Sequence, residues 1–243
     1  MTSVYLTIDT EYSSALANSP CPVDRAENFA RSIACLTPDG PAGITHKLEL
    51  LKRYGQRAVF FVDPMPALVW GVAAIEDVVA PILAAGQDVQ LHCHTEWLKF
   101  APSGGPFVGL EGRNIKDFAF EEQCRILEWA RDTLVAAGAP DPVAFRAGNY
   151  GANRDTLRAL RRLRHAQITA LSLKEMRAAL LHARDGRMTC FTLVSHSFEL
   201  INRRSLAVNK VVRARFEGLC RALQDIDGIC TADFAQSPPV KVF

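Results

Sequence analysis

The hydrophobic positions of this chain change their period along its length, and the changes predict strands alternating with helices. Short apolar runs rich in β-branched residues, such as Val4–Ile8, are typical of buried strands. Longer segments with apolar positions three or four residues apart, such as Ile44–Tyr54, predict amphipathic helices. The expected strands are Val4–Ile8, Arg57–Val62, Asp88–His92, Val143–Arg146, Gln167–Leu171, Thr189–Val194 and Gly228–Thr231. The expected helices are Ile44–Tyr54, Ala73–Ala85, Lys116–Ala137, Asn153–Arg164 and Ser205–Leu223.

This alternation determines the expected fold class. Strands that alternate with helices predict a parallel sheet, and about seven such units in one chain favour a distorted (β/α) barrel over an open sheet. The sequence contains no internal repeat and no linker, so residues 1–243 are expected to form a single domain. Three stretches depart from the rhythm, and we expect loops or insertions at Ser13–Pro41, Phe100–Gly112 and Leu173–Arg187.

Composition and charge exclude several classes of protein. The chain has 243 residues, of which 49% are hydrophobic, and this composition excludes intrinsic disorder and coiled coil. Its 28 Lys+Arg against 26 Asp+Glu give a net charge of +2, too small to indicate a nucleic-acid partner. No apolar run approaches the ~18 residues of a membrane span. The N-terminus resembles a strand more than a signal peptide, and the seven scattered cysteines favour reduced thiols, so we expect a cytoplasmic protein.

Chemically active side chains gather where the predicted strands end. The first strand ends in D-T-E, the third in H-C-H-T-E-W, and the fourth and sixth contribute an arginine and a histidine. Alternation along a strand puts every second residue on the same side. Because the carboxyl ends of parallel strands meet at one end of a barrel, we expect these side chains to lie close together. They are Asp9, Glu11, His92, His94, Arg146 and His196.

These residue types together indicate a mononuclear metal site with acid–base partners. Two imidazoles and one carboxylate are a common ligand set for Zn²⁺ and similar divalent ions. A second carboxylate can hold a water molecule and take its proton, and a histidine from another strand can protonate a leaving group. A nearby arginine can orient the base carboxylate and lower its pKa.

The sequence also resembles a known family. The motifs LTIDTEY, RAVFFVDP, DVQLHCHTEW, AFRAGNYGAN and LVSHSFEL are similar, in order and spacing, to those of the polysaccharide deacetylases, carbohydrate esterase family 4, with their NodB homology domain. The resemblance runs from about Val4 to Thr231 and is strongest to a subgroup with D-T-E and H-x-H-x-E-W motifs. It implies a distorted barrel and metal-dependent hydrolysis of an N-acyl group, in the first place acetyl, on an amino sugar.

The resemblance also implies roles for individual residues. Asp9 matches the catalytic base, and Arg146 matches the arginine that holds this base. His196 resembles the late-motif histidine that acts as general acid. Glu11 and His92 stand at metal-binding positions, which implies one divalent ion, with zinc favoured over cobalt, nickel, manganese or iron.

The third protein ligand stays open between two residues. The family's second metal histidine lies four positions after the first, and Glu96 occupies that position here. We favour His94, because a residue two positions from His92 shares its side of the strand. Glu96 would instead keep the family spacing and give a harder, oxygen-rich site.

Four further residues are candidates for substrate binding. By family analogy, a backbone N–H near Tyr12 stabilises the oxyanion that forms during hydrolysis. Trp97 follows the second motif, where it would either form a sugar-stacking wall or pack in the core. Asn149 and Tyr150 stand beside the fourth strand, where they would contact substrate or simply shape a turn.

One departure from the family keeps other functions open. The family's acid after the fifth strand, which orients the late histidine, has no counterpart in Gln167–Ser172, and Glu199 is a candidate replacement. The expected partner is an N-acylated carbohydrate or a small cyclic or linear amide. The alternative is a non-catalytic homologue that binds a glycan or a protein. Pairing of two copies through the barrel rim stays open.

Overall fold

The computed structural model describes residues 2–19, 22–160, 172–186, 188, 190–202 and 205–234. The strands of the main sheet are β1 (Thr2–Thr10), β4 (Val59–Val62), β5 (Asp88–Cys93), β6 (Phe145–Ala147), β7 (Cys190–His196) and β10 (Ile229–Thr231). Two short hairpins are β2 (Leu36–Thr37) with β3 (Gly40–Pro41), and β8 (Ile201–Asn202) with β9 (Ala207–Val208). The helices are α1 (Ser14–Ala17), α2 (Arg25–Asn28), α3 (Ile44–Arg53), α4 (Ala67–Trp70), α5 (Ala73–Ala84), α6 (Phe120–Ala136), α7 (Arg154–Leu160), α8 (Leu173–Asp185) and α9 (Lys210–Asp225). Within the described ranges, no helix has the length and apolar character needed to cross a membrane.

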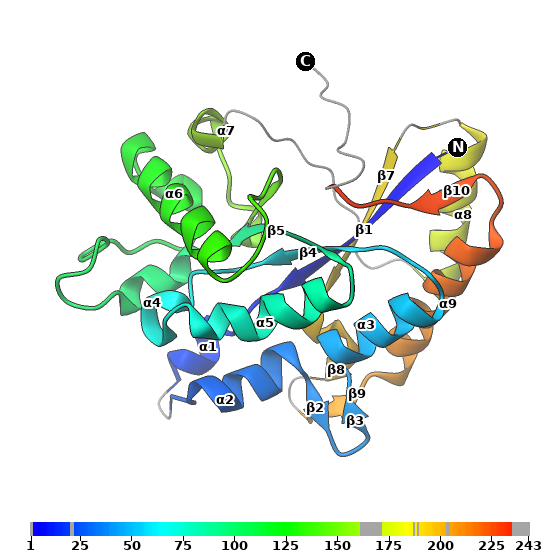
Figure 1. Ribbon diagram of the computed structural model, residues 1–243, viewed down its shortest axis with the longest axis horizontal. Coiled ribbons are helices and arrows are strands. Elements are labelled where there is room, and N and C mark those ends of the chain that lie inside the picture. Colours follow the sequence, from blue (N-terminus) through cyan, green and yellow to red (C-terminus); the bar gives the residue numbers. More distant parts are fainter. Residues whose placement is uncertain are drawn as a thin grey trace.

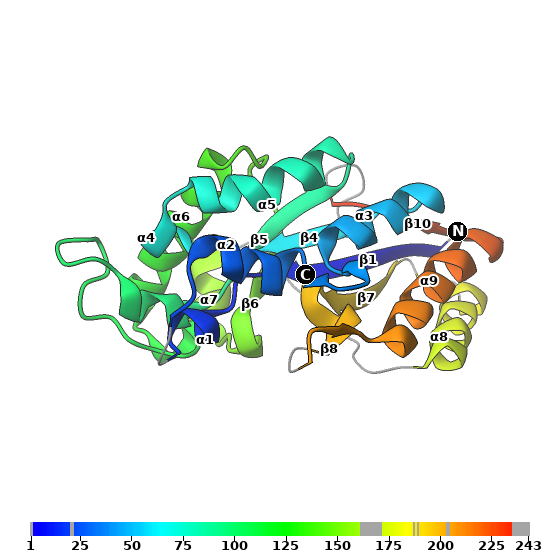
Figure 2. The same ribbon diagram turned by 90° about the horizontal axis from the view of Figure 1, so that it is seen from below.

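The main sheet is parallel at every strand pair and is organised around β1. One edge of β1 pairs with β7, whereas its other edge pairs first with β10 and then with β4, which continues to β5 and β6. Helix α5 packs on β4 and β5, α6 packs on β5, and α8 packs on β7. The sheet thus curls into a half-barrel with helices outside it (Figures 1 and 2), which confirms the predicted distorted (β/α) barrel.

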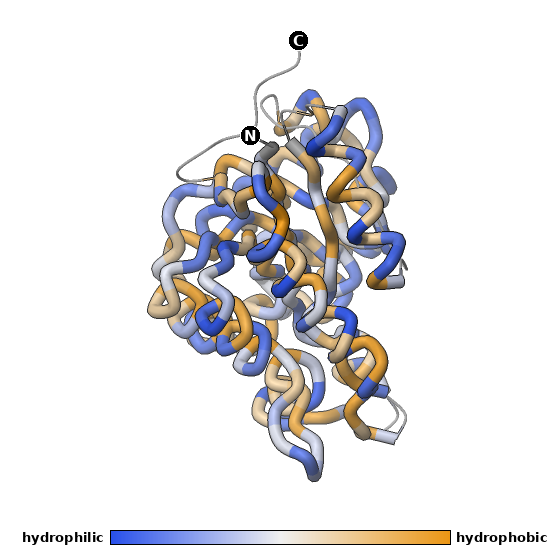
Figure 3. Tube along the Cα trace, turned by 90° about the vertical axis from the view of Figure 1, so that its right-hand side faces the viewer, coloured by the Kyte–Doolittle hydropathy of each residue, from blue (hydrophilic) through white to orange (hydrophobic). Residues whose placement is uncertain are grey.

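Alternation along the strands divides the buried side chains into two clusters. On β1, Leu6 and Ile8 belong to the large core between sheet and helices, whereas Tyr5 belongs to a smaller cluster with Val59 and Phe61 of β4. The helices in Figure 3 alternate between hydrophilic and hydrophobic positions, as expected when only one face is buried. Successive residues of a strand point to opposite faces of the sheet. The even-numbered residues Leu6 and Ile8 face the large core, so the odd-numbered residues of β1 lie on the other face, where the candidate site is.

Most predicted boundaries agree with the structure to within a few residues. Helix α3 begins at Ile44 as predicted, and Gly55 follows it with a left-handed φ of 60°. Asn153 caps α7, as its Oδ1 accepts a hydrogen bond from the backbone N–H of Thr156 at 2.9 Å. The predicted strand at Gln167–Leu171 and the end of the helix predicted to reach Arg164 lie outside the described residues.

Two expectations were wrong because local capping was overlooked. Leu173–Arg187 was expected to be a loop or an insertion, but it contains α8. Two reciprocal hydrogen bonds close the N-terminus of this helix: Ser172 Oγ accepts from Glu175 N–H, and Glu175 Oε2 accepts from Ser172 N–H at 2.7 Å. The last long helix begins at Lys210 and not at Ser205, because Asn209 caps it and β9 takes the preceding residues.

The predicted helix Lys116–Ala137 also starts late. Residues Ile115–Asp117 form a separate 3₁₀ turn, and α6 begins at Phe120. The side chain of Glu122 accepts a hydrogen bond from the backbone N–H of Ala119 at 2.9 Å, which fixes the start of the helix there.

Candidate active site

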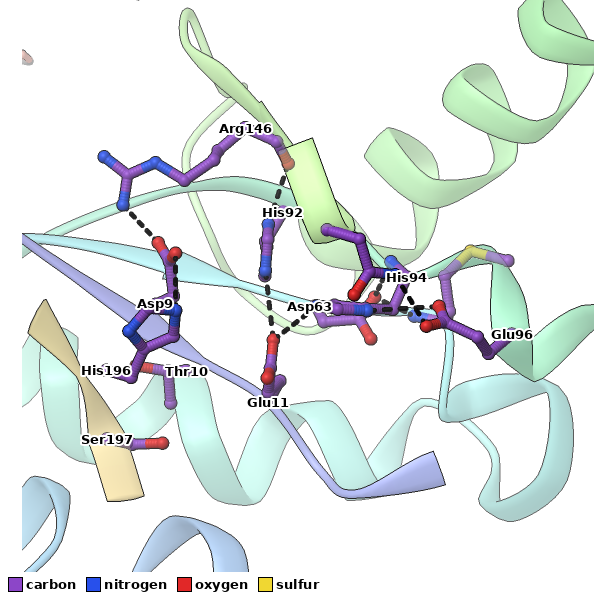
Figure 4. A network of polar contacts seen from close by, with 12 residues as sticks. Asp9, Thr10, Glu11, Asp63, His92, His94, Glu96, Arg146, His196 and Ser197 are labelled. Carbon is purple, nitrogen blue, oxygen red and sulfur yellow. Dashed lines mark hydrogen bonds and ion pairs between the residues drawn. The ribbon is translucent and has the colours of Figure 1, made fainter. Parts of the chain in front are cut away.

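Asp9 lies at the end of β1, and its carboxylate is held by an arginine from β6, the strand at the far edge of the sheet. Its carboxylate is 1% exposed, and Oδ1 accepts a charged hydrogen bond from Nη1 of Arg146 on β6. Nη2 of Arg146 donates to Thr7 Oγ1 at 2.8 Å, and the guanidinium lies 4.2 Å from the ring centroid of Phe61. These contacts fix the orientation of the Asp9 carboxylate, as Figure 4 shows, and leave Oδ2 facing another side chain.

That side chain is His196, at the end of the neighbouring strand β7. The two residues are register partners in the sheet, and Nε2 of His196 lies 3.5 Å from Asp9 Oδ2. Nδ1 lies 3.1 Å from Oε1 of Glu199. Burial alone would lower the pKa of His196, but the hydrogen bond to Glu199 and the charges of Asp9 and Glu199 outweigh it, so this pKa is raised. The arrangement favours a protonated imidazole, as a proton donor requires.

A second cluster joins β1 to the end of β5. Oε2 of Glu11 lies 3.0 Å from Nε2 of His92 and 2.7 Å from Nε2 of His94. One ligand atom from each of these three residues lies within 4.8 Å of the others. Burial opposes ionisation of Glu11, but the two imidazoles outweigh it and hold the pKa of Glu11 well below its usual range. With both imidazoles deprotonated, the cluster can offer one carboxylate oxygen and two ring nitrogens to a single ion.

The hydrogen bonds of His92 show that this donor set fits a cation. Nδ1 of His92 lies 2.7 Å from the backbone carbonyl of Arg146. Because a carbonyl only accepts, Nδ1 carries the proton, and in neutral His92 the lone pair of Nε2 points toward Glu11. Converging lone pairs of this kind, with the second ring nitrogen fixed by an outer partner, are the pattern of a metal-binding histidine.

Glu96 lies on the other nitrogen of His94. Its Oε2 is 3.1 Å from His94 Nδ1, whereas Glu11 contacts His94 Nε2. Oε1 of Glu96 accepts a hydrogen bond from Nδ2 of Asn149 at 2.7 Å. The converging set therefore contains His94, and Glu96 stands behind it as a carboxylate that orients the ring. Of the two alternatives left open by the sequence, this geometry favours His94.

Comparison with known proteins identifies the fold. No family model matches the sequence, and no curated protein matches it significantly. Among solved structures, a Mycobacterium smegmatis protein described as a polysaccharide deacetylase is 16% identical with a TM-score of 0.65, over 97% of this chain and 88% of that one. The family 4 acetyl xylan esterase of Clostridium thermocellum, in complex with a cobalt ion, is 12% identical with a TM-score of 0.52, over 97% and 89%. The chitin deacetylase of Colletotrichum lindemuthianum is 13% identical with a TM-score of 0.51, over 96% and 85%.

This chain has the polysaccharide deacetylase fold. Within that fold, the structure adds Asp63 to the candidate residues. Asp63 follows β4 and is 1% exposed, and its Oδ1 accepts hydrogen bonds from the backbone N–H groups of Met65 at 3.1 Å and His94 at 3.3 Å. Its Oδ2 is buried without a hydrogen-bond partner among the described residues. Burial raises the pKa of Asp63 to about 6, against the lowering charges of His94 and His92.

Asp63 directly follows the predicted strand Arg57–Val62 but was not among the candidate site residues. The signal that could have identified it is the one already applied to Asp9: an acidic residue directly after a strand of the same parallel sheet. A buried carboxylate oxygen without a donor is rare in a purely structural role, which supports its inclusion in the site.

The loop after β6 of this deacetylase fold is shaped around His94. A Cβ added to Gly148 would lie 2.7 Å from the carbonyl oxygen of Cys93 and 2.8 Å from Cγ of His94, so only glycine fits there. Asn149 and Tyr150 follow with left-handed φ values of 51° and 56°. Tyr150 is 51% exposed, and burial together with the charge of Asp9 raises its pKa. Its substrate contact stays a prediction.

Two aromatic side chains near the site, Trp97 and Tyr12, pack inward. The Trp97 ring is fully buried, with its centroid 5.3 Å from that of Trp70 and 5.8 Å from that of Phe100. No surface of this ring is open to a sugar, so of the two alternatives left open for Trp97 the structure favours core packing. The Tyr12 hydroxyl donates to the carbonyl of Ala74 at 3.0 Å, so its side chain is also structural, and only the backbone role predicted for it remains.

Proposed function

We propose that this protein is a metal-dependent hydrolase that removes an N-acyl group, in the first place acetyl, from an amino sugar. One observation carries the proposal: Asp9 shares its two carboxylate oxygens between Arg146 and His196. This acid–base pair, on β1 and β7, stands at the same end of the parallel sheet as the cluster around Glu11, on β1 and β5. The deacetylase fold of the whole chain supports the same chemistry.

Glu11, His92 and His94 would hold one divalent cation, and zinc suits two imidazoles with one carboxylate. Such a cation, when bound, polarises the substrate carbonyl and lowers the pKa of water. The cobalt ion in the acetyl xylan esterase of the same fold supports a divalent cation. Glu96, from behind His94, would keep the ring in the required orientation.

The side chains of this chain would then move two protons. Asp9 accepts the proton of the attacking water at Oδ2, because Arg146 already occupies Oδ1. The oxygen of the water bonds to the acyl carbon, and the C–N bond breaks. His196 donates the proton of Nε2 to the departing nitrogen, while Glu199 holds Nδ1 and stabilises the charged ring. The products are acetate and a free amine.

The substrate is proposed to approach over the loop that carries Tyr150. This side chain is half exposed, and the charge of Asp9 contributes to its raised pKa. A ring of this kind suits the face of a sugar. Small cyclic or linear amides are the second substrate class, since the same acid–base pair would cleave them.

The test is release of acetate from N-acetylglucosamine and its oligomers, run beside ring opening of small cyclic amides. Protein loaded with Zn²⁺, Co²⁺ or Mn²⁺ is compared with chelator-treated protein and with the His92→Ala variant. Acetate release that needs both the metal and His92 supports the proposal. Ring opening without acetate release would replace N-acetylated sugars by small cyclic amides as the proposed substrate class. Saturable glycan binding without any product would favour a binding protein and overturn the proposal.

A further inference from the structure

A buried lysine stands directly behind the proposed acid. Lys47 of α3 is 0% exposed, and its Nζ donates hydrogen bonds to Ser195 Oγ at 3.0 Å and to the backbone carbonyl of His196. The ammonium also lies 5.1 Å from the ring centroid of Phe216. Burying an ammonium group costs free energy unless it is well paired, so a fully enclosed lysine at this position needs an explanation.

A series of hydrogen bonds, each with a defined donor and acceptor, links Lys47 to the proposed acid His196. An ammonium group only donates, so Ser195 Oγ accepts from Lys47 and is left with its own proton to give. That hydroxyl lies 2.8 Å from Oε2 of Glu199 and 3.4 Å from the carbonyl of His196, so the shorter bond goes to the carboxylate. Glu199 in turn faces Nδ1 of His196 through Oε1. A continuous chain therefore runs from Lys47 to the imidazole.

The chain also ties together parts of the protein that are distant in sequence. His196 and Glu199 are three residues apart, at the end of β7 and in the 3₁₀ turn Ser197–Leu200 that follows it, so they do not anchor each other to the rest of the fold. Lys47 comes from α3, 148 residues before Ser195. It contacts both the side chain that holds Glu199 and the backbone of His196, so it can fix the turn relative to the barrel.

We propose that Lys47 is a positioning residue for His196. It acts on the imidazole ring through Ser195 and Glu199, and on the backbone of His196 through the hydrogen bond to its carbonyl oxygen. This inference rests on the proposed function, in which His196 is the proton donor. Lys47 does not touch the reacting atoms in this scheme. It keeps Glu199 directed at Nδ1 and offsets the charge of that carboxylate.

Loss of Lys47 should raise the apparent pKa of His196. Asp9 and Glu11 are anions that act on His196, and Lys47 is a cation that acts on Glu199. A second cation nearby, Arg146, is paired with Asp9. Removing a positive charge raises the affinity of the pair for its proton. Lys47 itself faces Glu199, Cys35 and Cys220, and burial lowers its pKa to about 8, so it is largely charged at neutral pH.

The experiment compares Lys47→Met and Ser195→Ala with Lys52→Met, which removes an exposed lysine from the same helix. The imidazole of His196 is titrated by NMR, with its signal assigned by the His196→Gln variant, so no substrate is needed. We expect the apparent pKa of His196 to rise by about half a unit or more in Lys47→Met, to rise less in Ser195→Ala, and to stay unchanged in Lys52→Met. Ser195→Ala keeps the ammonium in place, so it provides the test if Lys47→Met fails to fold.

Kinetics on a substrate supply the second measurement. We expect kcat to fall about tenfold in Lys47→Met, with the alkaline limb of its pH profile moved to higher pH and the metal content unchanged. A His196 titration that matches the wild type in whichever of the two variants fold would overturn the positioning role. If no substrate is turned over by the wild type, the proposed function fails, but the titration still decides the role of Lys47.

Discussion

Oε1 of Glu199 lies 3.1 Å from Nδ1 of His196, from a position only three residues later in the chain. The sequence suggested Glu199 only as one candidate for an acid that Gln167–Ser172 lacks. In the structure, this carboxylate is also held from the other side by the Ser195 hydroxyl. The proposed donor therefore carries its own orienting group on the same turn.

Replacing Glu199 by Gln should move the alkaline limb of the kcat profile to lower pH. Glu199 helps to raise the pKa of His196, and a general acid works only below its own pKa. With the charge removed, His196 loses its proton at a lower pH, so we expect the rate at neutral pH to fall about tenfold. The measurement is kcat against pH, with Glu128→Gln on the exposed face of α6 as control. A limb that stays in place would mean that Glu199 does not orient the acid.

Asp9→Asn should retain the metal and lose turnover. Asparagine keeps an oxygen for Arg146 but is no base, so we expect kcat to fall about 10³-fold. The buried guanidinium also loses its counter-charge, which should lower the free energy of unfolding by about 3 kcal/mol. Elemental mass spectrometry, kcat and urea unfolding measure the three effects. A variant with the rate of the wild type would exclude Asp9 as the base.

The third ligand can be identified by two matched substitutions. His94→Ala should abolish stoichiometric metal binding, because it removes one of three converging donors. Glu96→Gln keeps a side chain of the same size behind the ring, so it should weaken binding by only about 10- to 100-fold. Titration calorimetry with Zn²⁺ compares both variants with the wild type. The reverse order of affinities would assign the ligand role to Glu96.

Gly148→Ala should disturb the metal site without touching a proposed ligand. The added Cβ would lie 2.8 Å from Cγ of His94 and would push on this ring. We expect Zn²⁺ affinity to fall about tenfold or more. Gly186→Ala, after α8, is the control, because the new Cβ there approaches only the carbonyl of His182, at 3.0 Å. Equal affinities for the wild type and Gly148→Ala would show that the loop does not position His94.

Removing Asp63 tests the residue that sequence analysis missed. Asp63→Ala takes away the acceptor for the backbone N–H of His94, so the segment that carries His94 should lose part of its support. We expect weaker Zn²⁺ binding, again by about tenfold, together with a lower Tm. Binding and thermal unfolding are measured on the same preparation. A lower Tm with unchanged Zn²⁺ affinity would assign Asp63 a purely structural role.

Much of the fold could be predicted from the sequence, because strand and helix periods are local properties of the chain. The longest helix that was missed, α8, begins at a capping pair between Ser172 and Glu175, a signal that is present in the sequence but was outweighed by poor hydrophobic periodicity. The burial of Trp97 could not be predicted in the same way. Phe100 is a local neighbour in the same 3₁₀ turn, Thr95–Phe100, but Trp70 meets the Trp97 ring only after β4 and β5 have paired.

The sequence by itself determined which side chains share a face. Two-residue alternation put Asp9 with Glu11, and His92 with His94, because successive side chains of a strand point to opposite sides. Only the tertiary structure decided which atoms meet. The pairing of Asp9 with His196 depends on the register of β1 with β7, and the contact of Lys47 with Ser195 depends on how α3 packs behind that strand. Such contacts join residues more than a hundred positions apart, and no local pattern specifies them.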